Sequence, residues 1–480
     1  ITFVAAFLSH IVCVFIEERA GLGSGNYDLI LKIIIRLTVC VLIPNVLYLL
    51  FYFKTNEFKL ILQKIKYLKN VRNNRVKKKT SALSASEKNL LSSLRMALTS
   101  QKPQKLKKCK SELINEASSH AVVPLLYDVI DKEDSEEKPS IDILQRETDK
   151  TVWQSYHLLF ESARLCNCLK DSGIKCAILK GCAAASFYPV PEYRKSGDID
   201  ILLCEPTESD RAVEVLSKMG YKVSEEQLAL HQIVMSSKTG IEAELHIMLS
   251  EPFDNSKINN YLNGLLKDIS DHIIYKEIMG ISVPILDDDY QAYELLLHML
   301  QHFLRRGFGL KLLCDWVVYW NEKTKDEIPG FITRYKQLIK ESEIGGFSDM
   351  ISSVCYHYLG LSEKAVLALL VKRKTPVSKE DANLFIREVL DGGEFGDKDE
   401  WRMVMLRGKG IGALVIEFHH QMNLNFPKAG KIFLLWPVLW TLTLIKFLRN
   451  NRKLRGKSSL KIIKKTGERS ALMEKINIWK

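Results

Sequence analysis

The sequence of 480 residues predicts an α+β protein preceded by one or two transmembrane helices. Residues 173–254 change from helical to strand-like periodicity, and strands alternate there with short helices. The residues on either side, 86–172 and 255–427, keep the apolar spacing that is typical of helices. Residues 1–53 contain two long apolar segments. We therefore expect an α/β core flanked by helical N-terminal and C-terminal regions.

The net charge of +12 is distributed unevenly along the chain. Residues 54–110 carry +15 and residues 448–480 carry +9, whereas residues 111–447 carry −12. An acidic body is a poor general binder of nucleic acid. Basic stretches beside apolar segments suit the anionic face of a membrane. We interpret the Lys-rich run as a membrane-surface anchor, with a nucleic-acid patch as the alternative.

Residues 33–53 are apolar enough to predict a transmembrane helix. At a rise of 1.5 Å per residue they would extend about 31 Å, which crosses a bilayer. The basic residues that follow place residue 54 onward on the cytoplasmic side. We predict a transmembrane hairpin over 1–53 and a basic juxtamembrane linker over 54–85. The alternative is a buried hairpin in a soluble protein.

Residues 428–480 read as an apolar helix followed by a basic tail. The apolar part, 431–448, has Pro437 near its middle and is short for a membrane span. An interfacial helix or a docked C-terminal helix explains it equally well. The first residue is Ile1, so we expect the chain to be the later part of a longer reading frame or an incomplete sequence.

Asp198 and Asp200 are the strongest candidates for chemistry. They stand at the start of a predicted strand, Ile199–Leu203, and residues two apart on a strand point to the same face. Two neighbouring carboxylates raise each other's pKa unless a cation neutralises them. A divalent ion is the ordinary solution, with Mg²⁺ (or Mn²⁺) favoured by carboxylate oxygens.

A second element, Lys180-Gly181, follows the predicted strand Ile174–Leu179. A glycine at such a turn lets backbone N–H groups approach a phosphate, and Lys180 would add a positive charge. Arg194 precedes the Asp198 pair by four residues and would steady a triphosphate. The alternatives are a plain strand–helix turn and a salt bridge within the loop.

A third element is the predicted strand that contains Glu242, Glu244 and His246, which share one face. A third carboxylate on a neighbouring strand is what a two-metal site requires, and it can help to deprotonate an attacking hydroxyl. A half-exposed amphipathic strand is the alternative. His298 and His302 lie one turn apart on a predicted helix. We assign Glu242, His246 and these two histidines to a candidate pocket rather than to a zinc site.

Taken together and in this order, these motifs resemble the uncharacterised nucleotidyltransferase family, which has the DNA-polymerase-β-like superfold. The resemblance extends over about 86–445 and includes the helical regions. The residues that carry it are Leu179-Lys180-Gly181, Tyr188-Pro189, Arg194, Asp198-Ile199-Asp200-Ile201-Leu202, Glu244-Leu245-His246, Ser119–Leu126, His298–His302, Gly307-Phe308-Gly309 and Leu313–Trp316.

The resemblance implies a mixed sheet with helices and metal-dependent transfer of a nucleotidyl group from an NTP. It implies that Asp198, Asp200 and Glu244 bind Mg²⁺ and that Gly181 contacts the nucleotide phosphates. Two departures bear on activity. Cys182 stands where the superfold usually has Ser or Gly, and Glu244 replaces the family's usual Asp.

Residues 1–75 resemble the C-terminal end of a polysaccharide flippase, through their two apolar segments and basic tail. The sequence thus predicts a membrane-tethered nucleotidyltransferase whose domain faces the cytoplasm and acts in surface-polysaccharide biosynthesis. Its acceptor is a sugar, a small molecule, a protein or RNA, and a polysaccharide-export protein is the expected partner. The alternative is a catalytically inactive nucleotide-binding or scaffold module.

Overall fold

The computed structural model describes most of residues 83–394 and a few residues outside that range. The described residues are 9–15, 32, 36, 39, 83–99, 107–133, 137–228, 231–253, 255–305, 307–394, 419, 422, 425–426, 435–436, 439–443 and 476. The chain divides into two compact units, Ile1–Ala82 and Leu83–Lys480. The first unit is described only at a short helical stretch, 9–15, and three further helical residues.

Across the described residues, no helix has the length and apolarity needed to cross a bilayer. Most of the predicted hairpin over 1–53, of the linker over 54–85 and of the tail over 428–480 lies outside the described residues. The predicted membrane helices therefore find no support in the structure.

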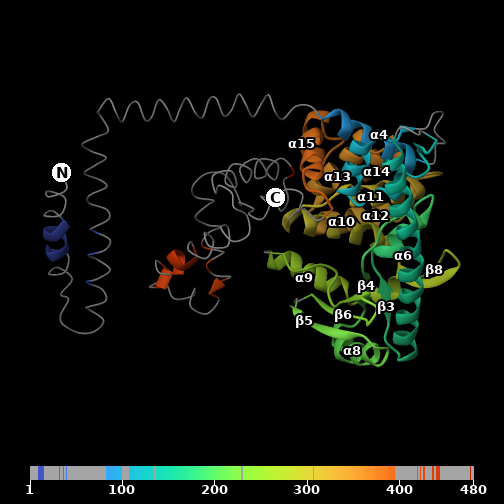
Figure 1. The fold of residues 1–480 in the computed structure, drawn as a ribbon. Helices are drawn as coiled ribbons and strands as arrows, with labels where there is room; N and C mark the ends of the chain where they lie inside the picture. Colours follow the sequence, from blue (N-terminus) through green and yellow to red (C-terminus); the bar gives the residue numbers. More distant parts are fainter. Residues whose placement is uncertain are drawn as a thin grey trace, which may run out of the picture. The chain divides into compact units, whose positions relative to one another are not determined.

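The second unit is built from a helical group and a seven-stranded mixed sheet (Figure 1). The α-helices are α4 (Ala85–Leu98), α5 (Ser111–Ser118), α6 (Lys138–Asp171), α7 (Gly181–Ala185), α8 (Ser209–Lys218), α9 (Ser256–Leu265), α10 (Asp288–Arg305), α11 (Leu310–Lys323), α12 (Ile332–Glu341), α13 (Gly345–Tyr358), α14 (Glu363–Leu369) and α15 (Lys379–Leu390). Short 3₁₀ turns are η1 (Pro124–Leu126), η3 (Pro191–Tyr193), η4 (Pro206–Glu208) and η5 (Ile269–His272). The α+β class predicted from the sequence is confirmed.

The seven strands follow the order β5-β6-β7-β4-β3-β9-β8. They are β3 (Cys176–Ile178), β4 (Ile199–Leu203), β5 (Lys222–Leu228), β6 (Gln232–Ser236), β7 (Glu242–His246), β8 (Ile273–Ile278) and β9 (Ile281–Leu286). The β4–β7 and β3–β9 pairs are parallel and the other neighbours are antiparallel. A separate two-stranded sheet joins β1 (Lys107–Lys108) to β2 (Ile130–Asp131).

The sheet extends beyond the segment that the sequence assigns to it. We expected residues 255–427 to be helical, but the β8–β9 hairpin, which turns at Met279-Gly280, adds two strands beside β3. Its second strand is apolar and largely buried. Periodicity alone does not distinguish such a short apolar run from a segment of a buried helix. Strand β5 was also missed, because its sequence KVSEEQL shows no apolar alternation.

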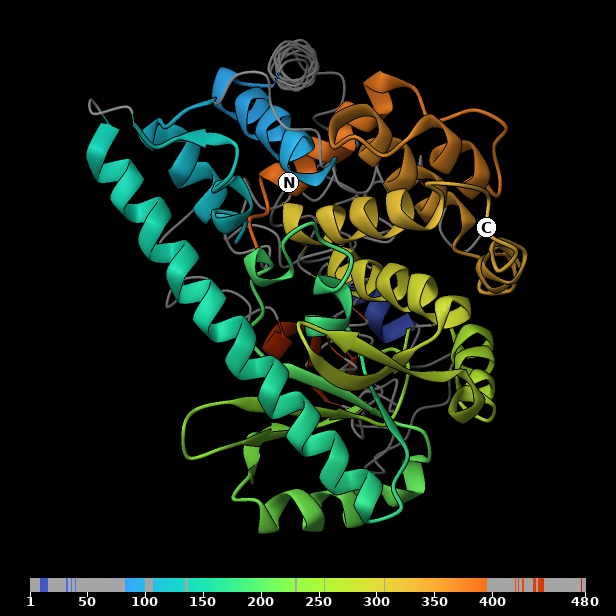
Figure 2. The same ribbon diagram turned by 90° about the vertical axis from the view of Figure 1, so that its right-hand side faces the viewer.

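Helix α6 connects the two hydrophobic cores of the unit. Near its start, Leu144 packs in the core formed by the helical group, whereas Leu158, Leu165 and Leu169 pack in the core between α6, α8 and the sheet. With 34 residues, the helix is about 51 Å long. Figure 2 shows it running across both parts of the unit. This helix therefore ties the sheet to the helical group, and the candidate site lies where these two parts meet.

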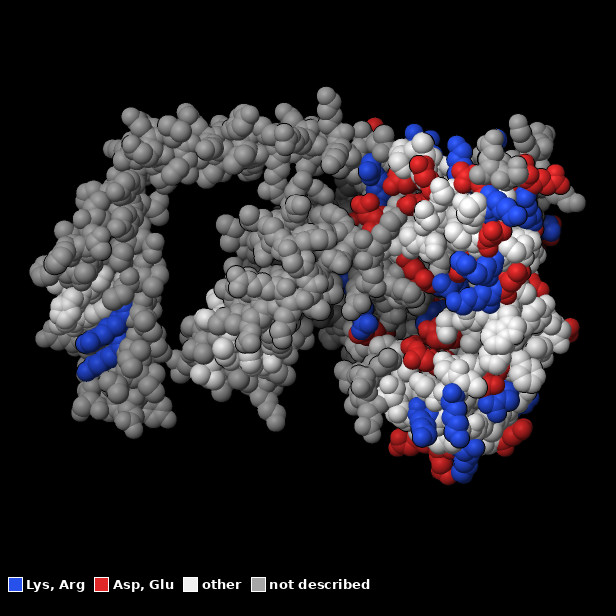
Figure 3. Space-filling view, in the orientation of Figure 1, with Lys and Arg blue, Asp and Glu red and all other residues white. Residues whose placement is uncertain are grey.

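The described face of the second unit carries charges of both signs. Figure 3 shows Lys and Arg side chains interspersed with Asp and Glu side chains over the part of this face that the structure describes. A mixed pattern of this kind does not form the basic stripe that nucleic-acid binding generally uses.

Gly309, at the N-cap of α11, lies directly against the backbone of Gly393 and Glu394. A Cβ at this position would lie 2.9 Å from the Gly393 carbonyl oxygen and 3.0 Å from the Glu394 Cα. The backbone N–H of Glu394 donates to the Ser119 carbonyl oxygen at 2.8 Å, which fixes that segment from the other side. Close packing at Gly309 thus positions Glu394.

We predict that Gly309→Ala lowers the free energy of unfolding by roughly 1–3 kcal/mol, because backbone must move to admit the methyl group. Urea denaturation of the full chain measures the effect. Gly330→Ala is the matched control, since nothing lies within 4 Å of a Cβ built there. Equal stability of the two variants would contradict the close approach at Gly309.

Candidate functional site

The centre of the candidate site is the parallel pairing of β4 with β7. Asp200 is directly opposite Glu244, and Leu202 is opposite His246. Because side chains alternate along a strand, Asp200, Glu244 and His246 project from the same face of the sheet. Their neighbours Ile199, Ile201 and Leu245 project to the other face and pack in the core beneath α6. Burial of these apolar residues fixes the register that brings the three polar groups together.

Ligand atoms of Asp200, Glu244 and His246 lie within 4.8 Å of one another. His246 Nε2 is 2.8 Å from Asp200 Oδ1 and 3.5 Å from Glu244 Oε2. The two carboxylates offer oxygen ligands to a divalent metal ion, whereas imidazole is a ligand type that suits zinc and iron better than Mg²⁺. Asp198 lines the same cavity but lies outside this group of atoms.

Lys180 pairs directly with the central carboxylate, its Nζ lying 2.8 Å from Asp200 Oδ1. Burial alone would raise the pKa of Asp200, but Lys180 and then His246 hold it below its usual value. Burial alone would lower the pKa of His246, and its hydrogen bonds to Asp200 and Glu244 raise it instead. Asp200 is therefore ionised over the whole physiological range.

Asp198 has the opposite electrostatic character. Burial, followed by repulsion from Asp200 and Glu244, raises its pKa to about 6, while Lys180 acts against this shift. A carboxyl group with this pKa binds and releases protons near neutral pH. The two aspartates of the motif therefore differ, one held charged and the other able to exchange a proton.

Lys180 and Gly181 form the turn between β3 and α7 in a left-handed backbone conformation. Their φ angles are +35° and +44°. Such angles are strained for lysine and cost little for glycine. A Cβ on Gly181 would lie 3.9 Å from the Asp198 carbonyl oxygen. The turn therefore lies beside the aspartate pair, and the Lys180 side chain reaches Asp200 from it.

Arg194 lies in the cavity wall, but its side chain is fully engaged within the protein. Its Nε and Nη2 donate to the two carboxylate oxygens of Asp315 at 2.7 and 2.8 Å. Nη1 donates to the Gly181 carbonyl oxygen at 3.2 Å and to Ser196 Oγ at 2.8 Å. Of the two alternatives raised by the sequence, the geometry favours a salt bridge, whose partner comes from α11 rather than from the loop.

A second wall of the cavity comes from α10 and the start of α11. His298, Gln301, His302 and Arg305 follow one face of α10, and the two imidazole rings lie 4.5 Å apart. Burial lowers the pKa of His298 well below its usual value and that of His302 to about 4, so both rings are neutral. The structure places both histidines, which the sequence assigns to a pocket, in the lining of this cavity.

The cavity has a volume of about 340 Å³. Besides the residues already discussed, its lining includes His231, Gln232, Glu251, Gly309, Lys311, Leu312 and Glu394. Arg305 pairs with Glu251, and Lys311 Nζ is 3.1 Å from Glu394 Oε1. Sequence analysis did not assign His231, Gln232, Glu251, Lys311, Leu312 and Glu394 to the pocket, because no spacing pattern links them to the predicted site residues. Glu242 is exposed and is not part of the lining, contrary to its assignment to the pocket.

Glu294 is buried behind this wall, one turn before His298. It is 3% exposed, and its Oε2 has no hydrogen-bond partner among the described residues. Burial raises its pKa to about 7, Lys180 opposes the shift and Asp200 adds to it.

A second group of metal-type ligands, His272, Asp287 and Asp289, is half-buried and lies outside the cavity lining.

Comparison with known proteins shows that the central region is similar to a described family. Residues 109–343 match the family model described as "Uncharacterised nucleotidyltransferase". The match confirms the predicted resemblance over a shorter range than the expected 86–445. No curated protein matches the chain. One solved structure, of an antigenic nucleotidyltransferase-like protein from Paracoccidioides brasiliensis, covers 38% of this chain and 88% of its own, at 15% identity and a TM-score of 0.25.

We predict that Asp315→Asn lowers the free energy of unfolding by about 3–5 kcal/mol, because it leaves the Arg194 charge buried without its counter-charge. Arg194 and Asp315 are 4% and 2% exposed. The control is Glu214→Gln, which removes an exposed pair with Lys218 and should leave the free energy of unfolding nearly unchanged. Urea denaturation measures the free energy of unfolding of both variants. Similar losses in the two variants would contradict a stabilising role for the buried Arg194–Asp315 pair.

Proposed function

We propose that this chain, whose residues 109–343 belong to the uncharacterised nucleotidyltransferase family, transfers a nucleotidyl group from an NTP to an acceptor. The observation that carries the proposal is the pairing of Asp200 with Glu244 on adjacent parallel strands, facing a cavity of about 340 Å³. The family supports nucleotidyl transfer as the general class of reaction. The particular residues and their roles are our proposal.

The reaction forms a bond between an acceptor oxygen and the α-phosphorus and breaks the bond from that phosphorus to pyrophosphate. The proton released by the acceptor hydroxyl passes to a carboxylate of the site. Glu244 suits this task because its side chain is 20% exposed, whereas Asp200 is 5% exposed and already pairs with Lys180 and His246. A general base must lie within hydrogen-bond distance of the proton that it removes, so access to the acceptor is considered before the pKa of the base.

Asp200, Glu244 and Asp198 would hold Mg²⁺ or Mn²⁺, with His246 beside them. A divalent ion bound there supplies positive charge that offsets the charge on the phosphate oxygens. Lys180 contributes a fixed positive charge at the same edge of the sheet, and the Lys180-Gly181 turn offers backbone N–H groups next to Asp198. Arg194 holds that turn in place through its bond to the Gly181 carbonyl oxygen.

We predict that Glu244→Gln and the double variant Asp198→Ala/Asp200→Ala each lower transfer activity by about 100-fold or more, because both remove carboxylates of the site. The assay incubates the full chain with each α-labelled NTP, Mg²⁺ or Mn²⁺ and cell extract, and measures label in the acceptor. Glu242→Gln is the matched control, since Glu242 lies on the same strand but is exposed.

Loss of transfer in Glu242→Gln to the same extent as in Glu244→Gln would contradict the assigned site. Metal-dependent nucleotide binding by the parent without any transfer would favour the alternative of an inactive nucleotide-binding or scaffold module. Digestion of the labelled product with ribonuclease, protease or glycosidase identifies whether the acceptor is RNA, a protein or a sugar, and resistance to all three indicates a small molecule.

We also propose that residues 1–82 tether the domain to the cytoplasmic face of a membrane and that the protein serves surface-polysaccharide biosynthesis, with a polysaccharide-export protein as partner. The support is the sequence of this unit: apolar residues 33–53, the basic run that follows, and the resemblance of 1–75 to a flippase end.

We predict that the full chain stays in the membrane fraction after a high-salt wash and is released by detergent, because an apolar span does not depend on charge. Fractionation followed by immunoblotting measures this. Release by salt alone would instead indicate attachment through the basic residues, and recovery without membranes would contradict the tether.

A further inference from the structure

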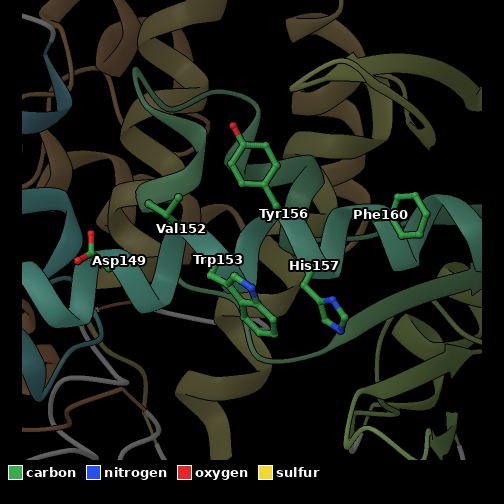
Figure 4. Close-up of a pocket in the computed structure, with 6 residues that line it drawn as sticks. All are labelled: Asp149, Val152, Trp153, Tyr156, His157 and Phe160. Carbon is green, nitrogen blue, oxygen red and sulfur yellow. The ribbon is translucent and has the colours of Figure 1, made fainter.

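Helix α6 exposes a stripe of large aromatic side chains on the surface of the second unit. Trp153 is 68% exposed, Phe160 is 62% exposed and Tyr156 is 45% exposed. Together with Asp149, Val152 and His157, they line a shallow hollow on this helix, and Figure 4 shows all six projecting from α6. Grouped exposed aromatic residues on one helix face are unusual in a surface that contacts only water, and mark a candidate interaction surface.

The stripe is held in a defined arrangement before any partner binds. The Trp153 ring stacks on His157 with centroids 5.0 Å apart and an interplanar angle of 11°. The Tyr156 hydroxyl donates to Glu192 Oε1 at 2.8 Å, which fixes its ring against η3. Pre-ordered aromatic side chains lose little conformational entropy when they are buried, so they are effective anchors for an interface.

The sequence of the stripe is symmetric about the midpoint between Tyr156 and His157. Trp153 and Phe160 lie equally far from that midpoint, in opposite directions. Asp149 and Arg164, both exposed, also lie equally far from it. If two copies of α6 packed antiparallel about a twofold axis through this point, Trp153 would face the partner's Phe160. Asp149 would face the partner's Arg164, which places opposite charges together at both ends.

We propose that α6 is a homodimer interface in which two copies pack antiparallel around this aromatic stripe. A twofold interface uses the same surface patch on both subunits, so that patch must complement itself. The stripe meets this requirement in the placement of its aromatic residues and of its opposite charges. Residues spaced by three and four, such as Trp153, Tyr156 and Phe160, are also those that a facing helix contacts.

The charges of the stripe favour a second copy over a lipid surface. A helix face that binds an anionic membrane is rich in Lys and Arg. Here Asp149 lies within the stripe, where its negative charge would repel an anionic lipid surface. A mixed, self-complementary pattern suits a partner that carries the same pattern.

The interface is separate from the candidate catalytic cavity. Buried residues of α6, including Leu165, pack with Ile199 and Ile201 on one face of the sheet, whereas Asp200 projects from the opposite face. Dimerisation through the outer face of α6 leaves the cavity accessible. The proposal therefore does not rest on the proposed function.

The test is sedimentation velocity of the full chain over a range of concentrations. We expect the parent to be a dimer and Trp153→Ala/Phe160→Ala to raise the dissociation constant by about tenfold or more. Asp149→Arg and Arg164→Asp should each weaken the dimer, since each places like charges opposite one another. The double variant Asp149→Arg/Arg164→Asp should restore it, because the two charges are exchanged at both ends.

A cysteine near the twofold axis provides a second measurement. His157→Cys should form a disulfide with the partner's His157→Cys on mild oxidation. Asn167 is also exposed on α6 but lies far from the axis. Asn167→Cys should therefore form no more disulfide-linked dimer than the parent. Circular dichroism verifies that every variant is folded. A monomeric parent, or a dimer insensitive to all of these changes, would overturn the proposal, as would Trp153-dependent binding of monomers to phosphatidylglycerol vesicles.

Discussion

The parallel pairing of β4 with β7 is the constraint on which the candidate site depends. It places Asp200 opposite Glu244, within reach of His246 and next to the Lys180-Gly181 turn. Like charges at this separation repel, so the arrangement requires compensation. Lys180 supplies it within the chain, and a divalent ion would supply it during the proposed reaction. The apolar residues on the other face of the strands hold the register against this repulsion.

The helical group contributes a second constraint, because the site is completed only where the helices meet the sheet. The buried Arg194–Asp315 pair links the loop before β4 to α11 and also holds the Gly181 carbonyl oxygen. Helix α10 provides the opposite wall with two neutral imidazoles, which offer hydrogen bonds without adding charge. A substrate in this cavity would therefore meet charge on the sheet side and, on the α10 side, two neutral imidazoles with Arg305 at the end of the helix.

Sequence analysis located the part of the site whose signals are local. Asp198 and Asp200 are two residues apart at the start of β4, Glu244 and His246 are two residues apart on β7, and His298 and His302 lie one turn apart on α10. Each pattern follows from the geometry of a single element. The β8–β9 hairpin, the Arg194–Asp315 pair and the approach of Glu394 to Gly309 depend on contacts between distant segments. One sequence contains no local pattern that reports such contacts, and Glu242 was misassigned because strand alternation alone does not fix the depth of burial.

The most direct test of the central claim is to locate a bound metal ion. Crystals of the full chain grown with Mn²⁺ and a non-hydrolysable NTP analogue would show its position by anomalous scattering. The account predicts an ion about 2.0–2.3 Å from carboxylate oxygens of both Asp200 and Glu244, next to the nucleotide phosphates. An ion bound only at His272, Asp287 and Asp289, or a nucleotide bound elsewhere with Lys180 still paired to Asp200, would contradict it.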